Sequence, residues 1–176
     1  MSKVARTLRR SVAGTTILLM TAVPAEAGSS VDNSLQGEVN RVLAQHPGGR
    51  QISDHQIAWN HGSVVLSLPA RGHEALAAAG SVQGCPAGWF CFYADLNWGG
   101  RKLQFSDCSS GGTTQFLTDY GFGNQTSSWV VNRGLNFVNV NDNETGNNLW
   151  NEAGNSSSAW VGAAANDRAD WFICYS

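Results

Sequence analysis

Charge is scarce in this chain, and basic charge is scarcest of all. Only 14% of the 176 residues are Asp, Glu, Lys or Arg, and Lys3 and Lys102 are its two lysines. Four of the eleven basic residues lie in the first ten positions: Lys3, Arg6, Arg9 and Arg10. Nucleic acid is therefore a poor partner, because its phosphate backbone requires clustered Lys and Arg. With 42% hydrophobic residues the chain is still too apolar to be disordered throughout.

A long apolar stretch is also absent. The run Val12–Val23 is shorter than the roughly 20 residues that a membrane-spanning helix needs. It follows the basic start and precedes Pro24 and Ala25-Glu26-Ala27, a small-x-small pattern that signal peptidase recognises. We therefore expect residues 1–27 to be a signal peptide, and the mature protein to be secreted without membrane association. Removing four of eleven basic and one of thirteen acidic residues leaves a net charge of −5.

Sequence motifs of common catalytic sites are missing as well. The chain has no Gly-x-Ser-x-Gly, His-Glu-x-x-His or phosphate-binding glycine loop. All four histidines precede residue 74, so a Ser-His-Asp or Cys-His site would have to bridge both ends of the chain. We expect that the protein is not an enzyme.

The four cysteines are Cys85, Cys91, Cys108 and Cys174. An even set in an oxidising compartment predicts two disulfides, with three possible connectivities. We favour Cys85–Cys91, which closes a short loop, together with Cys108–Cys174, which spans the C-terminal part. In the chain-entropy model these bonds stabilise by about 2.4 and about 4.4 kcal/mol. The Cys85-x5-Cys91 spacing disfavours a zinc site.

The mature chain divides into two unlike parts, of which residues 28–70 are the first. One helix face is marked there by four apolar residues at helical spacing: Leu35, Val39, Val42 and Leu43. Asn33 is a candidate N-cap, and Pro47-Gly48-Gly49 ends the helix. A hairpin over residues 52–68 follows. Because so short a segment barely supports a core, it either packs on the rest or serves as a leader. Alanine-rich residues 71–84 are a predicted linker.

From Cys85 onward, short apolar runs alternate with Gly and Asn. Seven strands are expected: Trp89–Tyr93, Lys102–Phe105, Ser127–Val131, Phe137–Asn141, Asn148–Trp150, Trp160–Val161 and Trp171–Tyr175. Such strands favour an antiparallel sandwich or barrel. An internal repeat shifted by 46 residues matches Gly100 to Gly146 and Leu103 to Leu149. Two copies of one four-stranded unit would bury a shared core between two sheets.

Two motifs carry a resemblance to known families. Tyr93-x4-Trp98-x-Gly100 resembles the Greek-key signature of βγ-crystallins, in which the glycine permits a positive φ. The wider run from Cys85-Pro-Ala-Gly-Trp-Phe-Cys91 to Trp129 is similar to the secreted actinobacterial proteins of peptidase inhibitor family I36. For residues 85–176 the resemblance implies a mainly β, βγ-crystallin-like Greek-key sandwich, preceded by the small helix-plus-hairpin segment. Founding members of family I36 inhibit metalloproteinases such as thermolysin, which implies a secreted proteinaceous inhibitor.

An inhibitor needs an exposed loop held in a rigid, substrate-like shape, because little entropy is then lost on docking. The candidate loops are Ser109 to Phe116 and Asn141 to Asn148. Either would offer a carbonyl or carboxylate to the zinc of the protease. The expected partner is a secreted protease, in first place a metalloprotease, and the inhibitor is expected to be a monomer. Residues 28–84 are either retained or processed off.

A weak calcium site is a second implication of the resemblance. Microbial βγ-crystallins bind Ca²⁺ through Asn/Asp-Asn/Asp-x-x-Ser/Thr-Ser, and residues 123–128 and 166–171 keep part of this pattern. The weak Ca²⁺ candidates are Asn124, Ser127, Asn166 and Asp167, and no other cofactor is expected. Since Ca²⁺ takes roughly six to eight oxygen ligands, the site should be degenerate. The alternative function is a weak calcium-binding structural module, or a cell-wall carbohydrate-binding module, which clustered exposed tryptophans would favour.

Overall fold

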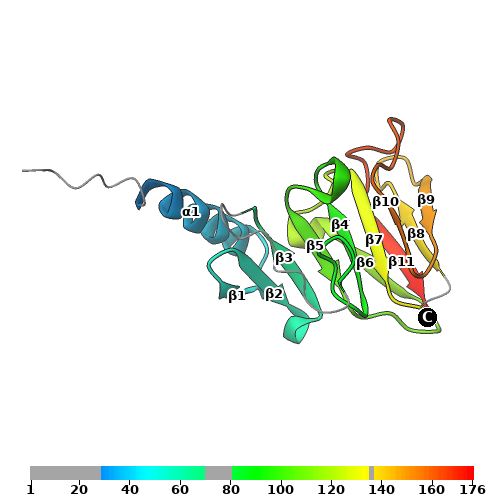
Figure 1. Cartoon of the computed structure of the whole chain (residues 1–176), viewed down its shortest axis with the longest axis horizontal. Coiled ribbons are helices and arrows are strands. Elements are labelled where there is room, and N and C mark those ends of the chain that lie inside the picture. The colour runs from blue at the N-terminus through cyan, green and yellow to red at the C-terminus, as the bar shows by residue number, and fades with distance from the viewer. Residues whose placement is uncertain (1–28, 70–80, 135–136) are drawn as a thin grey trace, which may run out of the picture.

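The computed structural model describes residues 29–69, 81–134 and 137–176, with side chains from residue 34 onward. The expected signal peptide and most of the expected linker lie outside the described residues. The described elements follow the chain in this order (Figure 1): α1 (Ser29–Gln45), β1 (Arg50–Ser53), β2 (Gln56–Trp59), β3 (Val64–Ser67), β4 (Trp89–Tyr93), β5 (Lys102–Phe105), β6 (Thr113–Phe116), β7 (Ser128–Asn132), β8 (Phe137–Asn141), β9 (Asn148–Glu152), β10 (Ser156–Ser158) and β11 (Trp171–Tyr175).

The N-terminal part forms one helix and three strands. Helix α1 ends at Gln45, just before Pro47, as predicted. It begins at Ser29, so the prediction that Asn33 caps it was wrong: Asn33 lies inside the helix. The predicted hairpin is the β2–β3 pair, and β1 adds a third strand in front of it.

The described strands form two antiparallel sheets. Seven strands pair in the order β1-β2-β3-β5-β4-β7-β10, and four in the order β6-β11-β8-β9. The two copies of the repeat are the four-strand units β4–β7 and β8–β11. The first unit lies in the larger sheet except for its third strand, β6, which joins the smaller sheet. The second unit lies in the smaller sheet except for its third strand, β10, which joins the larger one. This exchange interlocks the two repeats, and the predicted two-sheet Greek-key sandwich is confirmed.

Strand prediction failed where side chains are polar. Expected strands matched β4, β5, β8 and β11 in full, and β7 and β9 within two residues. The expected strand Trp160–Val161 is a loop, and Ser156–Ser158 forms β10 in its place. The residues of β6 were predicted to lie in the candidate loop Ser109 to Phe116 and not in a strand.

The repeat is real, but its register differs from the 46-residue match. In the first unit Leu103 pairs with Phe92, and in the second Trp150 pairs with Val140, so Trp150 rather than Leu149 is the counterpart of Leu103. A bulge in the β8–β9 pairing adds one residue, Leu149, which shifts all that follows by one position. Gly100 and Gly146 do correspond, and both have positive φ.

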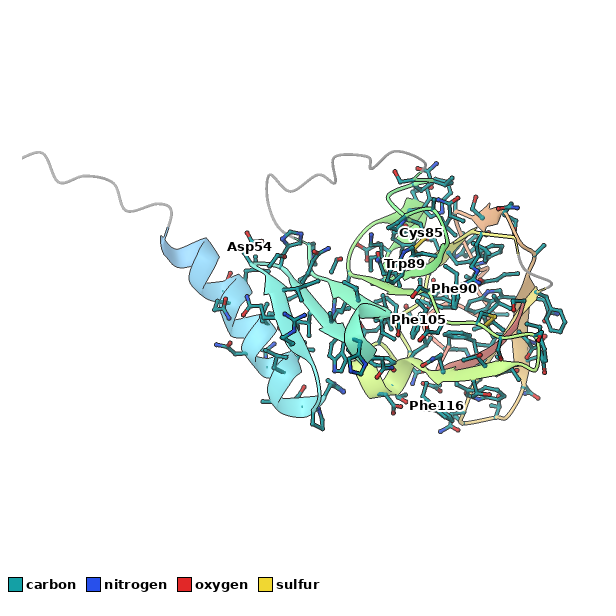
Figure 2. All side chains as sticks on the ribbon, turned by 90° about the horizontal axis from the view of Figure 1, so that it is seen from below. Asp54, Cys85, Trp89, Phe90, Phe105 and Phe116 are labelled. Carbon is teal, nitrogen blue, oxygen red and sulfur yellow. A yellow bond between two sulfur atoms is a disulfide. The ribbon has the colours of Figure 1, made fainter. Side chains whose placement is uncertain are left out.

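The core lies between the sheets and under α1. Two rows of paired residues cross five strands of the larger sheet on the same face: Ile57, Leu66, Leu103, Phe92 and Trp129, then Trp59, Val64, Phe105, Phe90 and Val131. Phe90, Phe105 and Phe172 meet with centroids 4.9 to 5.7 Å apart, and Phe90 and Phe105 are marked in the interior (Figure 2). Val39 and Val42 of α1 belong to the same buried cluster.

The N-terminal part is continuous with this core. Strand β3 pairs with β5 over four residues, from Val64↔Phe105 to Ser67↔Lys102. Trp59 meets Tyr120 edge-on at 5.3 Å, and Asn60 Nδ2 donates to the Tyr120 hydroxyl at 3.1 Å. The segment therefore packs on the rest of the chain, with α1 and β1 at one end of the molecule (Figure 1).

Both favoured disulfides are present. Cys85–Cys91 closes a short loop on the outer face of the larger sheet, beside Tyr93 and Val130. Cys108–Cys174 joins the segment after β5 to the last strand, with Cα atoms 5.8 Å apart.

Candidate functional site

The first candidate loop, Ser109 to Phe116, is shorter than expected. Its second half is strand β6, which pairs with β11. The rest is a turn at Ser109–Gly112, closed by the Gly112 N–H donating to the Ser109 carbonyl at 3.1 Å. Only Ser and Gly occupy this turn, so it offers a substrate pocket no apolar or charged side chain.

The second candidate loop, Asn141 to Asn148, is the β8–β9 hairpin, and a single buried carboxylate organises it. Asp142 is 2% exposed. Its Oδ1 accepts the Glu144 N–H at 2.7 Å, and its Oδ2 accepts the Thr145 hydroxyl at 3.0 Å. Gly146 N–H donates to the Asp142 carbonyl at 3.0 Å. Residues 143–147 remain exposed, so this loop is both fixed and accessible.

Charge reinforces the hairpin. Arg168 Nη2 lies 2.6 Å from Asp142 Oδ2, and Asp170 Oδ2 accepts the Asn143 N–H at 3.0 Å. Burial alone would raise the pKa of Asp142, but hydrogen bonds from Arg168, Glu144 and Thr145 outweigh it and hold the pKa below its usual value. Asp142 therefore stays ionised, and the loop keeps its anchor at neutral pH.

The loops that precede the last strands of the two units cross each other. Asn124 N–H donates to the Ala169 carbonyl at 2.9 Å, and Asp167 N–H donates to the Thr126 carbonyl at 3.2 Å. Asn124 and Asp167 both have positive φ, 55° and 56°. A chain shift of 43 residues relates each bond to the other, so the loops are pseudo-symmetric.

Three of the four Ca²⁺ candidates meet in one cleft of about 670 Å³. Ser127, Asn166 and Asp167 line it, together with Asp95 from the β4–β5 connection. Asn166 Oδ1 is buried without a hydrogen-bond partner among the described residues. Asn124 is not in this cleft. It lines a second one beside α1.

The corner that the pseudo-symmetry relates to this cleft differs from it in charge. In that corner the β8–β9 hairpin contributes Asp142, and the guanidinium of Arg168 already pairs with this carboxylate. No group of three or more His, Cys, Asp or Glu side chains is gathered at a metal-binding distance within the described ranges. Any cation would therefore depend on amide, hydroxyl and backbone oxygens as well as Asp95 and Asp167.

Comparison with protein families gives a match. Residues 78–150 match the model of peptidase inhibitor family I36. This match supports a protease inhibitor in general and, with it, a non-enzyme. No curated protein matches the chain.

Solved βγ-crystallin domains are similar to about half of the chain. A double mutant of clostrillin in complex with nickel is 28% identical, covering 50% of this chain and 98% of its own, with a TM-score of 0.40. A domain from Clostridium beijerinckii is 26% identical over 49% and 95%, with a TM-score of 0.39. A protein from Ciona intestinalis is 18% identical over 51% and 100%, with a TM-score of 0.39. The βγ-crystallin-like assignment rests on the strand exchange between the units β4–β7 and β8–β11.

Sequence reasoning missed two residues of the candidate sites. Asp95 was read only as part of the Tyr93-x4-Trp98 motif, although its place in the β4–β5 hairpin could have suggested it as a ligand. Arg168 was not predicted as the partner of Asp142, because 26 residues separate them and no pattern relates them.

Exposed tryptophans do not cluster on the described surface. Trp160, 52% exposed, is the one tryptophan among the exposed large apolar residues of the described ranges, while Trp59 and Trp129 are buried. The observation that would favour carbohydrate binding is therefore not met. No helix among the described residues is long and apolar enough to cross a membrane.

Proposed function

We propose that the protein is a secreted, monomeric inhibitor of a metalloprotease, and that the Asn141–Asn148 hairpin docks in the active site of that enzyme. The observation that carries the proposal is the fixed, exposed hairpin: residues 143–147 are accessible, and Asp142 holds them from beneath. The match of residues 78–150 to the model of peptidase inhibitor family I36 supports the inhibitor role. A preorganised loop loses little conformational entropy on docking, which favours tight binding.

Glu144 is the residue we assign to the zinc. A catalytic zinc keeps one position open for water, and a carboxylate oxygen is a suitable ligand there. Glu144 is exposed, and the bond from its own N–H to Asp142 Oδ1 fixes its backbone. The Ser109–Gly112 turn carries no carboxylate, which is why we favour the hairpin over the first candidate loop.

Replacing Glu144 by glutamine is expected to weaken inhibition about 100-fold, because the ligand charge is lost while size and fold are kept. The measurement is a titration of oxidised mature protein against a thermolysin-like protease with a small peptide substrate. Glu38→Gln, the same change on α1, should inhibit like the parent. Equal inhibition by Glu144→Gln would reject the role of the hairpin, and no inhibition by the parent at micromolar excess would reject the proposed function.

A weak Ca²⁺ site is a second candidate function, favoured by the cleft that gathers Asp95, Ser127, Asn166 and Asp167. Asn166 Oδ1, buried and unpartnered among the described residues, is the oxygen that a cation would satisfy. Only one such site per chain is proposed, because Arg168 supplies a cation in the related corner.

Calcium at about 10 mM is expected to raise the melting temperature, since dissociation constants of ~0.1–1 mM are typical of weak sites. Asp167→Asn should abolish the rise, because asparagine tolerates the positive φ at this position but brings no charge. Asp119→Asn, an exposed aspartate outside the cleft, should respond like the parent. A melting temperature that does not respond to calcium would exclude the site.

A further inference from the structure

A cleft of about 400 Å³ lies between the C-terminal half of α1 and the corner that follows β6. Its ionisable lining residues are Glu38 and Arg41 of α1, His46 directly after that helix, and Arg101 directly before β5. A Cβ at Gly121 would lie 2.7 Å from Nε2 of His46, so the residue that follows the helix packs directly on the backbone of this corner. The cleft thus lies between the N-terminal part and the unit β4–β7.

Arg101 brings to this cleft a guanidinium with unused donors. Its Nη1 donates to Gln125 Oε1 at 3.1 Å, and Gln125 Nε2 donates to the Gly121 carbonyl at 2.9 Å. Its Nε and Nη2 are buried and have no hydrogen-bond partner among the described residues. Burial lowers the pKa of Arg101, and the Glu38 carboxylate opposes this only in part. A buried cation with unpaired donors is costly unless a ligand pairs with them.

The unused donors select a particular anion. Nε–H and Nη2–H lie on one edge of the planar guanidinium, a fork that matches the two oxygens of a carboxylate. Glu38 is paired with Arg41 on its own helix, so Arg101 is the remaining permanent charge of the lining. One monovalent anion balances that charge. We propose that this cleft binds a carboxylate, held by both Nε and Nη2 of Arg101.

The bound carboxylate would belong to a small monocarboxylic acid or to the free C-terminus of a peptide. The helix-side rim, Arg41 and Gln45, is exposed, so these side chains can rotate to admit it. Because α1 and Arg101 come from different parts of the chain, a ligand between them stabilises their contact. Binding should therefore raise the melting temperature of the whole protein.

The experiment titrates the oxidised mature protein with sodium acetate against sodium chloride at equal ionic strength. The readouts are the melting temperature and the Arg101 Nε–H signal in ¹⁵N-resolved spectra. We expect a saturable shift of that signal with acetate alone. An acetylated tripeptide acid and its amide distinguish the sources: tighter binding of the acid than of acetate indicates a peptide terminus, and equal binding indicates a small acid.

Arg101→Lys keeps the charge but removes the fork, and should weaken acetate binding about tenfold or more. Arg50→Lys, the same change at an exposed arginine of β1, should bind like the parent. Glu38→Gln removes the competing carboxylate and should bind acetate more tightly. The proposal is overturned if acetate gives no saturable shift, if Arg101→Lys binds it as the parent does, or if Glu38→Gln binds it more weakly than the parent, because removing a competing carboxylate cannot weaken an anion held by Arg101.

Discussion

Replacing Glu152 by glutamine is expected to raise the free energy of unfolding at about pH 9 by about 5 kcal/mol, and to leave it nearly unchanged at about pH 4. Glu152 is 1% exposed, at the end of β9. Burial raises the pKa of its carboxyl group from 4.5 to about 8, against a hydrogen bond from Trp150 that lowers it. The folded protein thus keeps a proton that the unfolded chain releases.

The position of Glu152 in the repeat explains its burial. Glu152 pairs with Val138 as Phe105 pairs with Phe90, so the second unit carries a carboxyl group where the first carries a core phenylalanine. Trp150 Nε1 donates to Glu152 Oε1 at 2.9 Å, while Oε2 is buried without a partner among the described residues. Ionisation would leave a charge in the core with a single donor.

The sign of the effect follows from the two pKa values. Below about pH 4.5 the carboxyl group is protonated in both states and contributes no pH dependence. Between about pH 4.5 and about pH 8 only the unfolded chain ionises, and each pH unit lowers the stability by about 1.4 kcal/mol. Above about pH 8 the loss is complete. Glutamine keeps the acceptor for Trp150 and does not titrate, so the difference between the two proteins isolates Glu152.

Urea unfolding of both proteins across this pH range measures the effect. Glu144→Gln makes the same substitution at an exposed glutamate of the neighbouring hairpin, and its stability curve should run parallel to that of the parent. Parallel curves for Glu152→Gln as well would show that the carboxyl group is ionised in the folded protein.

Short apolar runs made most of the strands predictable. Strands β8 and β11 carry an apolar residue at least at every second position, and β4 is apolar throughout because Cys91 and Tyr93 face a second buried cluster; all three strands were located in full. Strands β6 and β10 are Thr-Thr-Gln-Phe and Ser-Ser-Ser, and no residue of either is buried. These are the two strands that cross between the sheets. Partner strands far away in the sequence hold them, and local residue patterns do not carry that information.

Register was the other feature that the sequence could not supply. A shift of 46 residues along the sequence aligns Leu103 with Leu149. The bulge at Leu149 changes the register by one residue, so Trp150 and Glu152 occupy the inward-facing positions of β9. One bulged residue therefore decides that a glutamate is in the core, because side chains alternate faces along a strand.

The candidate sites were predictable to the extent that they are local. The Asn141–Asn148 hairpin was recognised from the residues themselves. Asp95 joins Asn166 and Asp167, and Arg101 faces Glu38, only because the chain folds segments more than 60 residues apart against each other. Such pairs need the strand exchange and the packing of α1, and neither leaves a short motif in the sequence.

Removing the Cys108–Cys174 bond is expected to lower the free energy of unfolding by about 4.4 kcal/mol, from the loop closure of the unfolded chain. The bond spans 66 residues, from the segment after β5 to the last strand. Cys174 is fully buried in the main core. Without the bond, pairing with β6 and the core contacts hold β11 to the first unit in the folded protein. The unfolded chain regains the conformational entropy that the cross-link removes, and this lowers the free energy of unfolding.

The double variant Cys108→Ala/Cys174→Ala tests this, with Cys85→Ala/Cys91→Ala as its control. Cys85–Cys91 spans 6 residues, so its loss should cost only about 2.4 kcal/mol. Urea unfolding of the oxidised proteins gives both values, and digestion by an unrelated protease should follow the same order, since cleavage of an opened state tracks its population. Equal losses in the two double variants would contradict the loop-closure account and assign the stabilisation to packing around the sulfur atoms.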